Sequence, residues 1–118
     1  MNKEIKKRWV EALRSGEYKQ GAGKLRDADN TFCCLGVLCN LHAQEHPDIA
    51  KEQNIGTVYM GRSTLLPREV AEWAEFGRKE KAATPTGADV CTFRGRLSRL
   101  NDDGHSFTDI ADIIEEYL

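Results

Sequence analysis

The stretch Cys34-Leu-Gly-Val-Leu-Cys-Asn-Leu41 is apolar on nearly all sides, and Pro47 follows it closely. A helix that is apolar all round is buried inside its domain, and a proline marks where such a helix stops. We therefore expect a buried helix from about Cys34 to Glu45. Gly36 lies inside this helix and has no side chain, which would let another segment approach it closely there.

Three further segments have helical periodicity. Ile5, Trp9 and Leu13 recur every four residues, and the glycine at position 16 is a natural stop. A second helix is expected to start at Pro67, a proline at the first helical position, and to end near residue 77. A third is expected to start at Ser106, whose hydroxyl suits a helix N-cap. The apolar residues assigned to these last two helices are Val70, Trp73 and Ala74, and Phe107, Ile110, Ile113, Ile114 and Tyr117.

Three other segments favour extended structure. Residues 18–26 and 30–34 flank the turn-like Asp27-Ala-Asp-Asn30, which predicts a hairpin. Residues 56–65 favour a strand or an irregular hairpin, and residues 90–93 a short strand. We therefore predict an α+β fold with about four helices packed on a small antiparallel sheet. The 118 residues are expected to form a single domain, residues 1–118.

Charge and composition exclude some classes of function. The formal net charge is −2, so bulk electrostatics would not hold duplex nucleic acid. The charged N-terminus is not followed by an apolar run, and residues 32–39 are too few to cross a bilayer. We expect a cytoplasmic protein without a membrane partner. Its four cysteines, Cys33, Cys34, Cys39 and Cys91, are expected to be free thiols.

The most suggestive polar stretch is residues 20–26, Gln-Gly-Ala-Gly-Lys-Leu-Arg, which we call the glycine segment. Backbone N–H groups near glycines can form an anion-binding nest, and basic side chains add charge to it. The spacing matches neither a P-loop nor a dinucleotide fingerprint. The alternative is a hairpin whose glycines serve backbone geometry alone. The predicted ligand-binding residues here are Gln20, Gly21, Gly23, Lys24 and Arg26.

A second basic string follows Phe93. If residues 90–96 are extended, Arg94 and Arg96 point the same way and could clasp a phosphate or a carboxylate. The alternative is a solvated charged edge that discourages strand pairing.

Other chemistry has weaker support in the sequence. Cys39, His42 and His46 share a helical face, but a zinc site needs about four ligands, and we predict no metal site. Nothing places a base such as His105 beside a cysteine, so no catalytic residue and no cofactor are predicted. We expect a protein that is not an enzyme.

Several strings resemble a group of short proteins encoded by tailed phages and prophages. They are Trp9-x-x-Ala-Leu-Arg-Ser-Gly-Glu-Tyr18, Gln20-Gly-x-Gly-x-Leu-Arg26, Phe32-Cys-Cys-Leu-Gly-Val-Leu-Cys39, Leu66-Pro-x-x-Val-x-x-Trp73 and Leu100-Asn-Asp-x-Gly-x-Ser-Phe107. The resemblance covers most of the chain except residues 42–56 and 78–90. It implies an accessory phage protein made in the bacterial cytoplasm, and carries over no catalytic residue.

Two functions stay open at this point. In the first, the protein is a phage anti-defence protein that binds and sequesters a small phosphate-bearing nucleotide signal without catalysis. In the second, it is a protein–protein inhibitor of a host defence protein. The basic strings favour the first hypothesis because they supply donors for an anion. The sequence does not decide between a monomer and a homodimer.

Overall fold

The computed structural model describes residues 1–49, 54–55, 58–61, 63, 66–75 and 97–117. Its main helices are α1 (Lys3–Ser15), α2 (Cys34–Glu45), α4 (Arg68–Trp73) and α6 (Phe107–Tyr117). Two short strands, β1 (Asn54–Ile55) and β2 (Val58–Tyr59), pair antiparallel. Helical turns also occur at residues 47–49 and 97–102.

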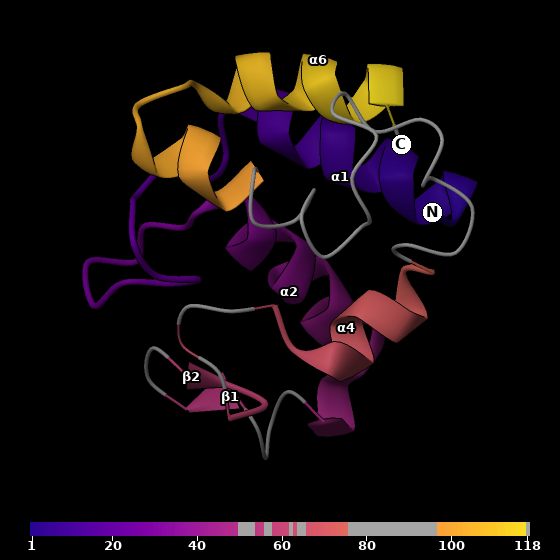
Figure 1. Cartoon of the computed structure of the whole chain (residues 1–118). Helices are drawn as coiled ribbons and strands as arrows, with labels where there is room; N and C mark the ends of the chain where they lie inside the picture. Colours follow the sequence, from indigo (N-terminus) through magenta and orange to yellow (C-terminus); the bar gives the residue numbers. More distant parts are fainter. Residues whose placement is uncertain (50–53, 56–57, 62, 64–65, 76–96, 118) are drawn as a thin grey trace.

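The helices are arranged around α2 (Figure 1). Helix α6 lies along α1 and runs antiparallel to it, so that the end of α6 and the start of α1 are on the same side. Helix α2 packs against α1, and α4 packs against α2. The β1–β2 pair lies away from α6. Each outer helix is amphipathic, because it needs only one apolar face to cover the core.

Helix α2 is the centre of the core, as its apolar sequence predicts. Nine of its residues are buried. The fully buried Trp9 side chain of α1 donates from its indole N–H to the Cys34 carbonyl at 2.9 Å. The close approach that Gly36 would allow is present, since a Cβ built there would lie 1.7 Å from the Leu25 carbonyl oxygen. That carbonyl belongs to the glycine segment, which is therefore seated directly on α2.

The helix ends follow their local sequence. Asn2 caps α1, accepting from the N–H groups of residues 4 and 5, and Gly16 stops it with a left-handed φ of 79°. The Ser106 hydroxyl accepts from the Asp109 N–H at 3.2 Å, which confirms the predicted N-cap of α6. Pro67 is the residue just before α4 rather than its first helical residue. The helix ends at Trp73, with Ala74 as its C-cap, so the predicted end near residue 77 is wrong.

The predicted α+β fold is wrong, because the protein is helical. In the described ranges the regular strand pairing joins two residues of β1 to two of β2. A ladder of that size cannot form the layer on which about four helices were expected to pack. The pair overlaps residues 56–65, where extended structure was expected, but begins two residues earlier. The predicted strand at 90–93 falls outside the described residues.

The predicted hairpin of residues 18–26 and 30–34 is present only around its turn, where the Asp27 N–H donates to the Thr31 carbonyl at 2.8 Å. Phe32 makes two isolated bridges, one with Gln20 and one with Arg26, and no ladder extends from them. The backbone of this region also bonds outside it, since the Leu25 N–H donates to the Ser63 carbonyl at 2.7 Å. Extended propensity is a weak signal, and tertiary hydrogen bonds override it here.

Candidate functional site

The glycine segment is attached to the start of α6 through Gln20. The Gln20 side-chain N–H₂ donates to the His105 carbonyl at 2.6 Å and to Asn101 Oδ1 at 3.0 Å. The side-chain oxygen of Gln20, Oε1, accepts from the Phe107 N–H at 3.2 Å. Gln20 thus satisfies the first backbone N–H of α6, which has no partner within that helix.

The two glycines predicted to cradle an anion are also bonded inside the chain. The Gly21 N–H donates to the Phe32 carbonyl at 2.7 Å, and the Gly21 carbonyl accepts from Asn101 Nδ2 at 2.7 Å. The Gly23 N–H donates to Asp102 Oδ1 at 2.8 Å, and Gly23 has a left-handed φ of 83°. A carboxylate of the chain therefore bonds the N–H group to which a ligand phosphate was expected to bind.

The remaining predicted ligand-binding residues are basic. Lys24 is exposed and Arg26 is half-buried. Arg94 and Arg96 lie outside the described residues, immediately before the helical turn at 97–102. The structure brings Gln20, Gly21 and Gly23 together against residues 101–107, a pairing that the sequence did not predict. The Asn101 side chain is the centre of these contacts, because it hydrogen-bonds with Gln20, with Gly21 and with the Cys34 N–H. Only the three-dimensional contacts identify this role of Asn101.

The described thiols belong to the core. Cys33, Cys34 and Cys39 are free and buried, and burial raises the pKa of each thiol. Cys34 Sγ donates to the Leu97 carbonyl at 3.6 Å, and the Gly36 N–H donates to Cys33 Sγ at 3.4 Å. A raised thiol pKa reduces the thiolate that nucleophilic attack requires. Cys91 lies outside the described residues.

Two histidines near the end of α2 form a compact aromatic cluster. The His42 and His46 rings stack with centroids 4.3 Å apart, and the Trp73 ring meets both edge-on. The Tyr59 hydroxyl hydrogen-bonds with His42 Nδ1 at 2.5 Å. Burial, and then the neighbouring His46, lower the pKa of His42 to about 4. Within the described ranges, no three metal-binding side chains come together.

A groove of about 440 Å³ lies on α1 beside the end of α6, and we call it the lysine groove. Its lining residues are Lys3, Lys6, Lys7, Val10, Glu11, Arg14 and Glu115. The three lysines come from the first turns of α1 because positions 3, 6, 7 and 10 fall on one face of a helix. In the described part of the chain, none of these lysines makes an ion pair.

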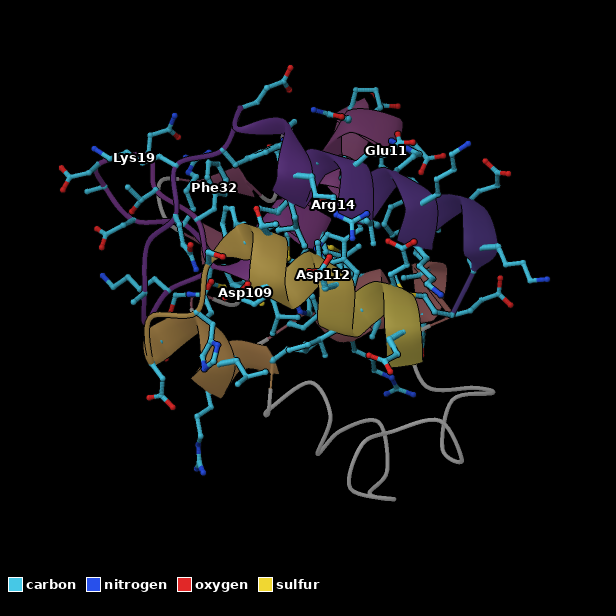
Figure 2. The ribbon with its side chains drawn as sticks, turned by 90° about the horizontal axis from the view of Figure 1, so that it is seen from above. Glu11, Arg14, Lys19, Phe32, Asp109 and Asp112 are labelled. Atoms are coloured by element: carbon cyan, nitrogen blue, oxygen red, sulfur yellow. The ribbon has the colours of Figure 1, made fainter. Side chains whose placement is uncertain are left out.

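Among the described residues of the groove, Arg14 is the cation that forms ion pairs. Its guanidinium donates to Asp112 Oδ1 at 2.6 Å and lies 2.6 Å from Glu115 Oε2. Figure 2 shows Arg14 and Asp112 facing each other between α1 and α6. These carboxylates, with Asp112 the larger influence, raise the pKa of Arg14. Arg14 therefore ties the two helices together.

The lysine groove was missed from the sequence. Oppositely charged residues three or four positions apart are neighbours on an exposed helix. Glu4 is three residues before Lys7 and Glu11 is four residues after it, so the sequence of α1 offers Lys7 acidic neighbours. The pattern therefore carried no signal that the lysines would be unpaired, and only the three-dimensional contacts among the described residues show it.

Comparisons with known proteins describe the family and add no function. No curated protein matches the chain, and no solved structure matches it either. In the described residues, none of the helices is both long and apolar enough to cross a membrane. A family model described as a domain of unknown function, DUF8296, matches residues 1–118, and the chain therefore belongs to that family.

Proposed function

We propose that the protein binds and sequesters a small phosphate-bearing nucleotide without changing it chemically, and that the lysine groove is the binding site. One observation carries this proposal: three lysines line a groove and none of them has an ion-pair partner in the described part of the chain. The groove's volume of about 440 Å³ is within the range of small-molecule sites.

The charge arrangement on α1 supports an anionic ligand. Lys3 and Lys7 are four residues apart, and like charges at this spacing destabilise a helix by about 0.2–0.5 kcal/mol. A bound phosphate would convert that repulsion into attraction to a shared partner. Lysine ammonium groups bind phosphate as point charges and tolerate several orientations of it. The first backbone N–H groups of α1 take no part, because Asn2 already caps them.

Sequestration agrees with the state of the described thiols. Cys33, Cys34 and Cys39 are buried with raised pKa values, so none is prepared for nucleophilic attack. The setting of the proposal, a phage protein that keeps a signal from a host defence effector, rests on the resemblance to tailed-phage accessory proteins. The glycine segment enters the proposal as support for α6 and α2.

Calorimetric titration with cyclic and ADP-ribose-type nucleotides tests the proposal. Changing Lys3, Lys6 and Lys7 together to Gln removes the charges and keeps most of the side-chain length. We expect this variant to lose about a thousandfold or more in affinity, since each of the three charge-assisted contacts is worth about 1.5–3 kcal/mol. Lys19→Gln is the matched control, because Lys19 is exposed and does not line the groove.

Two results would contradict the proposal. Wild-type protein that binds none of these nucleotides at about 1 mM would exclude sequestration. In that case a host protein that co-purifies with the folded chain would favour the protein-inhibitor hypothesis. A triple variant that binds as tightly as wild type would exclude the lysine groove as the site.

A further inference from the structure

The lysine groove has two chemically different ends along α1. Lys3, Lys6 and Lys7 belong to the first turns of the helix, whereas Glu11 and Arg14 belong to later turns. A helix rises by about 1.5 Å per residue, so Glu11 lies about 6 Å beyond Lys7 and about 12 Å beyond Lys3. That interval is on the scale of a nucleoside monophosphate. A ligand that fills the groove would therefore contact ammonium groups at the end near Lys3 and carboxylates at the end near Glu11.

Among the described residues that line the groove, Glu11 is the carboxylate without an ion-pair partner. Glu115 lies 2.6 Å from the Arg14 guanidinium, which also holds Asp112. Glu11 is exposed and makes no ion pair among the described residues, even with Lys7 one turn earlier. An ionised carboxylate can only accept hydrogen bonds. A ligand group that contacts Glu11 must therefore supply N–H or O–H donors, and a second phosphate at that end would be repelled.

We infer that the lysine groove binds a nucleoside phosphate whose phosphate meets Lys3, Lys6 and Lys7 and whose base donates N–H groups to Glu11. This inference rests on the proposed function and names its ligand class. Guanine fits best, because its N1–H and its 2-amino group are adjacent and match the two oxygens of one carboxylate. Adenine places an acceptor beside its amino group and offers Glu11 one such donor. A carboxylate is a discriminating partner for base amino groups in general.

Three probes separate the phosphate from the base: GMP, IMP and inorganic pyrophosphate. IMP differs from GMP only by the missing 2-amino group, so it loses one donor to Glu11. We expect wild-type protein to bind GMP about tenfold more tightly than IMP, the cost of one lost charge-assisted hydrogen bond. Calorimetry at fixed ionic strength measures all three affinities, since salt screens the lysine charges.

Glu11→Gln gives a test whose two effects have opposite signs. The variant should weaken GMP binding about tenfold, because glutamine has a single acceptor oxygen and no charge. It should strengthen pyrophosphate binding about two- to fivefold, because a repelling charge is removed from the groove. Glu17→Gln is the matched control, an exposed carboxylate outside the groove, and should change neither affinity.

The outcomes distinguish this inference from the proposed function. If wild type binds none of the three probes at about 1 mM, both the ligand class and the groove's function are excluded. If wild type binds GMP and IMP equally and Glu11→Gln strengthens the binding of every probe, the base contact is excluded while phosphate binding stands. Opposite signs for GMP and pyrophosphate in Glu11→Gln would confirm the inference.

Discussion

The glycine segment and the lysine groove are both rich in hydrogen-bond donors, yet the fold uses them in opposite ways. In the glycine segment, the donors of Gln20, Gly21 and Gly23 are bonded within the chain. In the groove, three ammonium groups have no ion-pair partner in the described residues. The difference follows from which segments lie opposite: Asn101 and Asp102 face the glycine segment and accept or donate its hydrogen bonds, whereas no carboxylate among the described residues pairs with the groove lysines.

Asp102 occupies the position in the glycine segment where a ligand phosphate was expected. An oxyanion does bind the Gly23 N–H, but it belongs to this chain and lies 2.8 Å away. Any phosphate bound there would have to displace it. No such competitor is seen at the three groove lysines in the described part of the chain. A sequence motif can therefore indicate the right donors without revealing whether the fold has already used them.

The largest expected effect removes the hub of the glycine segment. Asn101 is 2% exposed and bonds Gly21, Gln20 and the Cys34 N–H. Asn101→Ala leaves these groups without partners and should lower the free energy of unfolding by about 2–4 kcal/mol. Urea unfolding measures this, with the exposed Gln44→Ala as the control. Pyrophosphate affinity of the folded variant should stay at the wild-type value, and equal losses of stability in both variants would contradict the structural role.

A pH titration tests a region that belongs to neither site. The pKa of His42 is about 4 in the fold, below its ordinary value of about 6.5, so the unfolded chain binds the proton more readily. The contribution of His42 to the free energy of unfolding should therefore be fully present above pH 6.5. It should fall by about 1–2 kcal/mol as the pH approaches 4, after allowance for screening by solvent. Glu45, Glu69, His46 and Tyr59 are the titratable groups near this imidazole.

His42→Gln isolates that contribution, because other groups also titrate in this range. The difference between the wild-type and variant unfolding free energies should change by about 1–2 kcal/mol between pH 7 and pH 4. His105→Gln, at an exposed position, is the control. Parallel pH profiles for wild type and His42→Gln would show that His42 is not held neutral by the fold.

A smaller effect is expected at the start of α6, where Ser106 and Gln20 both satisfy backbone groups. Ser106→Ala should lower the free energy of unfolding by about 1 kcal/mol, the usual cost of losing an N-cap acceptor. Thr108→Ala is a suitable control at an exposed position of the same turn. Thermal unfolding that is unchanged in Ser106→Ala would mean that Gln20 alone supports this helix end.

The smallest expected effect bears most directly on the comparison. Lys24 is the exposed lysine of the glycine segment and lies outside the lysine groove. Lys24→Gln should change stability by less than about 0.5 kcal/mol and nucleotide affinity by less than about twofold. The same titration as for the groove lysines measures it. A tenfold loss of nucleotide affinity in Lys24→Gln would indicate that the ligand binds at the glycine segment and would contradict binding in the lysine groove.

The sequence by itself determined the main helices and several of their ends. The apolar run of α2, the spacing of Ile5, Trp9 and Leu13, and the Ser106 cap are local signals, so each was readable without the fold. Gly36 also indicated a close approach before its partner was known. These features depend on residues within a few turns of one another.

The tertiary structure alone decided the fold class, the partners of the glycine segment and the position of the groove. Residues 20–26 had extended propensity, but Asn101 and Asp102, about eighty positions later, bond their backbone and leave no strand ladder. The lysines line a groove because the end of α6 lies beside α1, with Glu115 paired to Arg14. Hydrogen bonds and charges act through space, so their partners are set by packing that a local sequence pattern does not contain.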